Sequence, residues 1–373
     1  MMKINILKID IFKMNVEITI PIKILLGGDL DAANNLAIKI TTDTGIIGWG
    51  EASPCAVITG DSQDTNYVTA QTMAKLIKGK NALSIESRMQ EINSVTVGDP
   101  SVRSAFDMAL YDIAAKAANM PLYQFLGGER RELRTDLTIG IKDTVEETVA
   151  QAKSIMEAGF DAIKLKVGRP GLEDVPHVRA VRELIGPDMS LKMDSNQGWD
   201  YPTAVANINA MEDLNLQYAE QPIAVWDYEG LARLRTKVNL PICADESVFD
   251  HRDALKLAKM EAVDYLNIKL GKAGGIHTGL KINAIAEAAG MKCMIGCFAE
   301  SRLGLSAAAH LAMARPNISF IDLDSCYHFK TDPVIGGVSY DDKIGGLLHL
   351  PDGIGHGAVF NESDLEQESK VTI

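Results

Sequence analysis

The sequence predicts an α/β protein: a barrel of eight parallel strands and seven helices, (β/α)7β, preceded by an α+β domain. From Arg134 onward, short apolar runs alternate with helical segments, and strands separated by helices pair in parallel. Before that point, strand-like alternation over residues 1–50 is followed by helical periodicity, which is typical of an α+β domain. We expect the first domain at 1–130, the barrel at 131–339, and a glycine-rich tail, about 340–373, that returns to the first domain.

The first domain begins with two alternating stretches, KINILKIDIFKMNVEI and LAIKITTDTGIIGWGE. The second contains a DTG turn, which favours a hairpin. Between them, Gly27-Gly28 and Asn34-Asn35 in PIKILLGGDLDAANN predict a loop. Helical periodicity then covers residues 67–93 and 101–119.

The barrel elements follow in strict alternation, and no helix is predicted after the eighth strand. Strands are expected at 135–140, 162–167, 190–196, 216–222, 241–247, 264–271, 291–296 and 318–325. Helices are expected at 144–158, 173–185, 202–213, 227–236, 250–259, 276–289 and 302–314.

Composition narrows the functional class. The net charge is −13 and no basic cluster occurs, so a nucleic-acid partner is not expected. No apolar run reaches the roughly 18 residues that span a membrane, and the N-terminus lacks the apolar core and cleavage site of a signal peptide. Five cysteines, an odd number, suit a reducing compartment. We therefore expect a cytoplasmic protein that acts on a small molecule.

The second barrel strand carries two lysines on one face. In AIKLK, Lys164 and Lys166 point the same way because strand side chains alternate with period two. Burying two ammonium groups side by side is costly unless anions surround them. We therefore expect carboxylates, an anionic substrate, or both, to face this strand.

Charged residues recur at the ends of the following strands. From Lys166 the steps to Asp194, Glu220, Asp245 and Lys269 are 28, 26, 25 and 24 residues, each one strand plus one helix. The series therefore places these groups at one height, on the carboxyl rim where barrel active sites lie. Three more acids continue it, at strands seven and eight: Glu300, Asp322 and Asp324.

The residue types indicate the chemistry. Asp194, Glu220 and Asp245 would repel one another unless a cation lies between them, and an all-oxygen set favours Mg²⁺. Lysines on strands two and six would face each other across that cation, which would lower their pKa and let them act as bases. Mg²⁺ can stabilise the enediolate left by removal of an α-proton. A base on each face predicts a 1,1-proton transfer, that is, racemisation or epimerisation.

Over nearly its whole length the chain resembles the enolase superfamily, muconate-lactonising subgroup. The matching segments are IIGWGEASP, SAFDMALYDIAAKAANMPLYQFLGG, KLK, MDSNQGW, EQP, ADES and NIKLGKAGG. The resemblance implies a modified TIM barrel (β/α)7β with an N-terminal α+β capping domain, a Mg²⁺ cofactor, and a homo-oligomer. FIDLDS resembles the DxD feature of dipeptide epimerases such as L-Ala-D/L-Glu epimerases, which implies an isomerase acting on the second residue of a dipeptide.

The resemblance also implies roles for individual residues. Lys166 and Lys269 would be the acid/base pair, and Lys164 would hold the substrate carboxylate. Asp322 and Asp324 would bind the dipeptide ammonium group, which also agrees with charge complementarity. The other pocket residues that it implies are Thr138, Phe298, Ala299 and Glu300.

The predicted lid loop leaves the second residue of the substrate open. An Ala-Glu epimerase would be expected to carry an arginine there, yet Gly28 stands at that position and Lys23 is the loop's cation. Lys23 could pair with an acidic side chain, whereas Leu25 and its apolar neighbours could line an apolar pocket.

Alternatives on the same scaffold are o-succinylbenzoate synthase and muconate cycloisomerase. Their substrates, like N-acyl amino acids, have no ammonium group, so Asp322 and Asp324 disfavour them. A catalytically silent barrel would lack one of these groups, and all are present.

Overall fold

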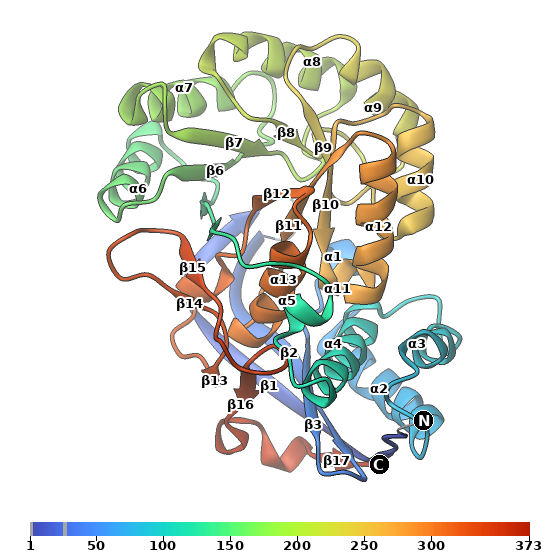
Figure 1. The fold of residues 1–373 in the computed structure, drawn as a ribbon. Helices are drawn as coiled ribbons and strands as arrows, with labels where there is room; N and C mark the ends of the chain where they lie inside the picture. Colours follow the sequence, from blue (N-terminus) through green and yellow to red (C-terminus); the bar gives the residue numbers. More distant parts are fainter. Residues whose placement is uncertain (1–2, 25–27) are drawn as a thin grey trace.

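The computed structural model describes residues 3–24 and 28–373. Its core is a sheet of eight parallel strands in the order β12-β11-β10-β9-β8-β7-β6-β5, which curves through the upper half of Figure 1. The strands are β5 Leu137–Ile139, β6 Ala162–Lys166, β7 Ser190–Asp194, β8 Ala219–Glu220, β9 Ile242–Ala244, β10 Tyr265–Lys269, β11 Lys292–Gly296 and β12 Ile318–Ile321.

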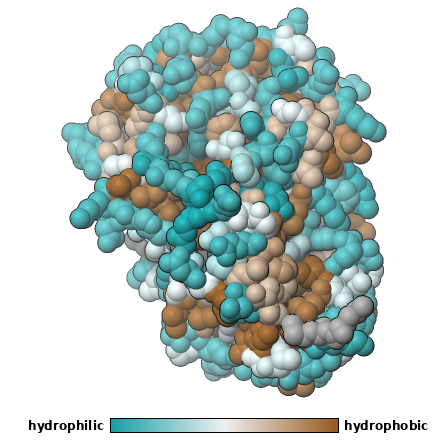
Figure 2. Space-filling model, in the orientation of Figure 1, coloured by the Kyte–Doolittle hydropathy of each residue, from teal (hydrophilic) through white to brown (hydrophobic). Residues whose placement is uncertain are grey.

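Seven helices connect these strands and confirm the predicted (β/α)7β barrel. They are α6 Val145–Glu157, α7 Asp174–Ile185, α8 Tyr201–Ala210, α9 Tyr228–Arg235, α10 His251–Lys259, α12 Ile276–Ala288 and α13 Arg302–Ala314. Two short helices are additional: η1 Glu212–Leu214 and α11 Leu270–Ala273. On the face shown in Figure 2, hydrophilic residues cover most of the barrel half. Among the described residues, no helix is long and apolar enough to cross a membrane.

Side-chain caps fix where several barrel helices begin. Thr144 with Glu147, and Asp250 with Asp253, form reciprocal capping boxes at α6 and α10. Single side-chain caps start α8, α9 and α13, from Asp200, Asp227 and Ser301. Because these helices begin soon after the strands end, the strand-end residues gather at one rim.

Hydrogen bonds join the two ends of the strand order. The Leu323 amide donates to the Thr135 hydroxyl at 2.8 Å, and the Asp136 amide donates to the Ile321 carbonyl at 3.4 Å. These bonds tie the segment before β5 to the segment after β12. They therefore bring Asp136 beside the segment that carries Asp322 and Asp324.

The N-terminal part contains an antiparallel sheet in the order β17-β1-β2-β3. Its strands are β1 Ile6–Ile24, β2 Gly28–Thr42, β3 Ile47–Ala52 and β17 Val371–Thr372. Its helices are α1 Ala56–Thr59, α2 Gln63–Ile77, α3 Ile85–Asn93, α4 Pro100–Ala117 and α5 Leu122–Phe125. The glycines of the GWGE segment let α4 approach β3: a Cβ at Gly50 would lie 1.8 Å from the Ala105 carbonyl oxygen. Any side chain there would push α4 off the sheet.

The last forty residues run along both parts of the chain. Thr372 of β17 pairs with Asp10 of β1, so the end of the chain returns to the N-terminal sheet. Leu348 of β15 instead pairs with Leu133 of β4. The remaining short strands are β4 Leu133–Arg134, β13 Val334–Gly336, β14 Ser339–Tyr340, β15 Leu347–His349 and β16 Ala358–Phe360.

Two predicted elements were wrong. The helical stretch over 67–93 is broken, because Gly79, at φ 78°, and Lys80 hydrogen-bond through their backbones to Ile6 of β1. The Asn34-Asn35 pair belongs to β2 rather than to a loop. The Asn35 side chain donates to the Glu51 carboxylate at 2.8 Å and to the Ala299 carbonyl at 2.7 Å. It therefore links the N-terminal sheet to the barrel. In the sequence alone, the same Asn-Asn pair is typical of a turn.

Candidate active site

A cavity of about 350 Å³ opens where the carboxyl ends of the barrel strands meet the N-terminal sheet. Residues 32–35 of β2 and 54–58 around α1 form its N-terminal wall. The barrel contributes Thr138, Lys164, Lys166, Asn196, Lys269, Cys297, Phe298, Ala299, Asp322, Asp324 and Ser325. Most of the predicted catalytic and substrate-binding residues therefore share one cavity.

Lys164 and Lys166 both enter this cavity from β6, and both are buried. The Lys164 ammonium contacts three acids: Asp322 Oδ2 at 2.7 Å, Glu220 Oε2 at 3.1 Å and Asp194 Oδ2 at 3.5 Å. Lys166 donates to Asp194 Oδ2 at 2.5 Å and to Asn196 Oδ1 at 2.9 Å. The two ammonium groups are thus tolerated because carboxylates surround them, as predicted.

Lys269 enters from the opposite wall, because β10 lies four places from β6 in an eight-strand order. Its ammonium pairs with Asp245 Oδ2 at 2.9 Å and lies 4.9 Å from the centre of the Phe298 ring. Burial would lower the pKa of Lys269 and of Lys164, but the adjacent acids outweigh it and raise both well above their usual value. The predicted lowering of these pKa values depends on a cation bound among the acids and stays a prediction. Such a cation would oppose the effect of the acids.

The predicted metal ligands are fully buried at three neighbouring strand ends: Asp194 and Glu220 are the last residues of β7 and β8, and Asp245 directly follows β9. Burial, and then the Asp194 charge, raises the pKa of Glu220 to about 7. Burial also raises the pKa of Asp194 and of Asp245, but the lysines around them reverse the shift and lower both. Glu220 Oε2 contacts the Lys164 ammonium group and Asp245 Oδ2 contacts the Lys269 ammonium group, and neither oxygen accepts a further hydrogen bond. Carboxylate oxygens are the hard donors that Mg²⁺ prefers.

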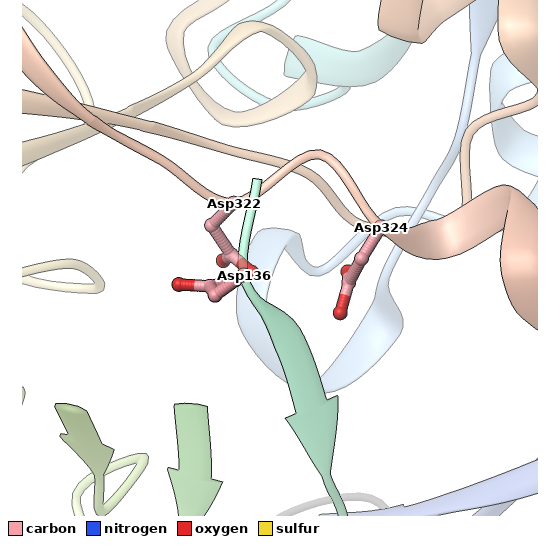
Figure 3. A group of neighbouring side chains, drawn as sticks. All are labelled: Asp136, Asp322 and Asp324. Carbon is pink, nitrogen blue, oxygen red and sulfur yellow. The ribbon is translucent and has the colours of Figure 1, made fainter. Parts of the chain in front are cut away.

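A second acidic cluster lies beside this set. Asp136, Asp322 and Asp324 each offer an oxygen within 4.8 Å of the others, a spacing consistent with a cation site (Figure 3). Asp136 pairs with Lys192 and Asp322 pairs with Lys164. Lysine ammonium groups therefore already neutralise two of its three members. The first set differs in its position, because its members lie at the ends of three consecutive strands, between those that carry Lys166 and Lys269.

The other predicted pocket residues divide into three groups. The Thr138 amide donates to Asp324 Oδ2 at 2.8 Å, and Phe298 and Ala299 line the cavity. Glu300 is buried behind the wall, where its carboxylate accepts the Phe298 amide. Leu25 lies outside the described residues. For Lys23 only the strand pairing with Asp29 is described.

Sequence reasoning missed two residues that hold the β10 end in place. Lys272 donates to Asp245 Oδ1 at 2.6 Å. Asp107 of α4 accepts the amides of Ile276 and His277 and so caps α12 from the N-terminal part. A Cβ at Gly275 would lie 2.3 Å from the Asp107 carboxylate, which explains the second glycine of the KAGG segment. The contact between Gly275 and Asp107 could not be predicted from the sequence, although the paired glycines indicate a tight turn at this position.

Replacing Glu300 with glutamine is expected to flatten the pH dependence of stability. Burial, and then the neighbouring Glu51 charge, raises the pKa of Glu300 from 4.5 to about 8. The folded state thus favours the protonated form, so wild-type stability falls as pH rises from about 4.5 to 8, by up to ~1.4 kcal/mol per pH unit. Glutamine, like the protonated acid, carries no charge, so the variant lacks this pH dependence of stability. Thermal unfolding between pH 5 and 8 measures it, with Glu157→Gln on the exposed face of α6 as control. Equal slopes for wild type and Glu300→Gln would contradict the prediction.

Comparisons with known proteins agree with this geometry. The family model "Mandelate racemase / muconate lactonizing enzyme, N-terminal domain" matches residues 6–127, and "Enolase C-terminal domain-like" matches residues 147–364. The chain is 38% identical to a D-Ala-D/L-Ala epimerase of Cytophaga hutchinsonii, over 99% of both chains. It is 40% identical to a hydrophobic dipeptide epimerase of Enterococcus faecalis (95% of this chain, 99% of the other). It is 38% identical to the L-Ala-D/L-Glu epimerase of Bacillus subtilis (95% and 97%).

Solved structures give the same result. The dipeptide epimerase of C. hutchinsonii, in complex with Mg and D-Ala-L-Val, superposes with a TM-score of 0.95, over 99% of this chain and 100% of that one. The E. faecalis dipeptide epimerase, with Mg and L-Leu-L-Tyr, gives a TM-score of 0.91, over 96% and 99%. The chain belongs to the mandelate racemase/muconate-lactonising subgroup of the enolase superfamily, where it is an isomerase of the dipeptide epimerase kind.

Proposed function

We propose that this protein is a Mg²⁺-dependent epimerase that inverts the α-carbon of the second residue of a dipeptide by 1,1-proton transfer. One observation carries the proposal. Lys166 and Lys269 enter a single cavity from opposite sides of the barrel, with buried carboxylates between them. One lysine can remove a proton from one face of the α-carbon while the other returns a proton to the opposite face.

The acids at the end of β12 support a dipeptide as substrate. Asp324 is oriented by the Thr138 amide on Oδ2, while its Oδ1 lies 3.8 Å from the Cys297 sulfur at the cavity wall. An ammonium group bound here would form a charge-assisted hydrogen bond. Substrates without an ammonium group, such as N-succinyl amino acids, would leave Asp324 buried and uncompensated.

The remaining groups fit the other end of the substrate. Asp194, Glu220 and Asp245 would hold Mg²⁺, which when bound supplies positive charge that stabilises the enediolate form of the substrate. Lys164 lies beside Glu220 and Asp194 and would hold the substrate carboxylate. Asn196 and Asp194 position Lys166, and Asp245 positions Lys269.

We further propose that the second residue of the substrate is apolar. The residues that line the N-terminal wall include Cys55, Ala56, Val57 and Ile58, and Phe298 lines the same cavity from the barrel. Among the described lining side chains, the cations are Lys164, Lys166 and Lys269, all three paired with acids. A second-residue carboxylate would therefore lack a free partner there.

The first test follows proton exchange at the α-carbon. Dipeptide pools are incubated with the protein and Mg²⁺ in D₂O, and mass spectrometry identifies the members that gain one mass unit at the second residue. We expect labelling of dipeptides with an apolar second residue, lost on addition of EDTA. Labelling of L-Ala-L-Glu in preference to apolar pairs would overturn the substrate class. Labelling of N-succinyl amino acids but of no dipeptide would overturn the function.

Replacing Asp324 with asparagine should raise the KM for a dipeptide about 10- to 100-fold, because a buried charge-assisted hydrogen bond contributes about 1.5–3 kcal/mol. Mg²⁺ affinity, measured by calorimetry without substrate, should stay the same, since Asp324 is not among the proposed ligands. The same KM in variant and wild type would show that the ammonium group binds elsewhere.

A further inference from the structure

A buried ion pair supports the acids that face the proposed ammonium site. Lys192 lies on β7, beside Lys164 in the strand register, and is 4% exposed. Its ammonium lies 2.5 Å from Asp136 Oδ2. The ring centres of Tyr218 and Phe320, 5.9 Å away, face the same ammonium. Among the described residues, Asp136 is the ion-pair partner of Lys192.

Asp136 is also held next to the β12 acids. Its carboxylate belongs to the cluster with Asp322 and Asp324 seen in Figure 3, and its Oδ1 is buried without a hydrogen-bond partner. Its backbone is fixed by the bond to Ile321 and by the Thr135 hydroxyl. Burial raises the pKa of Asp136, and the Lys192 ammonium opposes that shift.

The charges of this cluster leave room for one cation. Lys192 compensates Asp136, and Lys164 compensates Asp322. One carboxylate, Asp324, then remains uncompensated, which matches a single substrate ammonium group. Without Asp136 as its partner, the Lys192 ammonium group would compensate the neighbouring Asp324 carboxylate instead.

We propose that Asp136 is a positioning residue that holds the Lys192 ammonium group, so that Asp324 stays available for the ammonium group of the substrate. The inference rests on the proposed function, because it assumes that Asp324 binds that ammonium group. It makes Asp136 and Lys192 determinants of affinity for a free amino terminus, although neither lines the cavity. The different effects expected of the two single substitutions separate this role from a purely structural one.

Three variants test the inference with a dipeptide that the wild type labels in D₂O. Asp136→Asn frees Lys192 and should raise the dipeptide KM at least tenfold, with kcat within about threefold of wild type. Lys192→Met removes the competing cation, so KM should not rise. The double variant removes both charges and should return KM to within about threefold of wild type. Thermal unfolding and Mg²⁺ calorimetry confirm that each variant folds and binds metal.

Each outcome of these measurements either supports or overturns the role proposed for Asp136. Equal KM increases in both single variants, with no recovery in the double variant, would show that the pair is only structural. If Asp136→Asn does not fold, Lys192→Met and the double variant still decide, because a tenfold rise of KM in either would overturn the inference. If the wild type labels no dipeptide, the proposed function fails. If it labels dipeptides and Asp136→Asn leaves KM unchanged, only this inference fails.

Discussion

Replacing Lys166 with methionine should abolish epimerisation starting from either stereoisomer, yet leave α-proton exchange in one of them. Loss of a positioned acid or base costs roughly 10²- to 10⁴-fold. Inversion needs both lysines, since one removes the proton and the other returns it. Exchange needs only one lysine. Lys269 should therefore still exchange the α-proton for solvent deuterium in the stereoisomer whose α-proton faces β10.

The mirror experiment makes this prediction specific. Lys269→Met should abolish inversion as well, but should keep exchange in the opposite stereoisomer. Chiral chromatography coupled to mass spectrometry separates inversion from exchange for each stereoisomer in D₂O. Lys153→Met on the exposed face of α6 is the matched control, because it removes a lysine that lies outside the cavity. Exchange of the same stereoisomer by both catalytic variants would refute two opposed bases.

The barrel and its rim were predictable because their signal is local in the chain. Each charged residue follows its own apolar run, and the spacing of Asp194, Glu220, Asp245 and Lys269 equals one strand plus one helix. Parallel strands then bring all four to the same rim without further information. The opposition of Lys166 and Lys269 follows in the same way from counting strands.

The remaining features depend on contacts between distant segments. Asp136 and Lys192 are 56 residues apart, and nothing near either residue shows that they form a pair. Asn35 looks like a turn residue until Glu51 and Ala299 are brought to it. The break after α2 comes from backbone bonds to β1. The pKa of Lys164 depends on four acids from other segments of the barrel: Asp322, Glu220, Asp194 and Asp136. Such features follow from closing the barrel and docking the N-terminal sheet, so they require the folded chain.

Replacing Glu220 with glutamine should reduce Mg²⁺ affinity at least about 100-fold, because even an outer partner of a metal ligand contributes 10- to 100-fold. Glu220 lies on the middle strand of the three that carry the proposed ligands, and glutamine keeps its shape while removing its charge. Calorimetric titration of Mg²⁺ into EDTA-treated and dialysed protein measures the effect. Inversion of the dipeptide should fall by at least as much at low Mg²⁺ concentration.

The stability of Glu220→Gln, measured without metal, shows whether its lower Mg²⁺ affinity comes from loss of a ligand or from unfolding. The raised pKa of Glu220, about 7, means that folding favours its protonated form, so its contribution to stability is lost as pH rises from about 4.5 through 7. The glutamine variant avoids that loss and should be at least as stable as wild type at pH 8 in EDTA. A variant that is stable but weak in Mg²⁺ would place the metal among Asp194, Glu220 and Asp245. Unchanged Mg²⁺ affinity would instead direct attention to the second acidic cluster, where Asp322→Asn should then abolish binding. We expect the first result, because Asp194, Glu220 and Asp245 lie at the ends of consecutive strands, between those that carry Lys166 and Lys269.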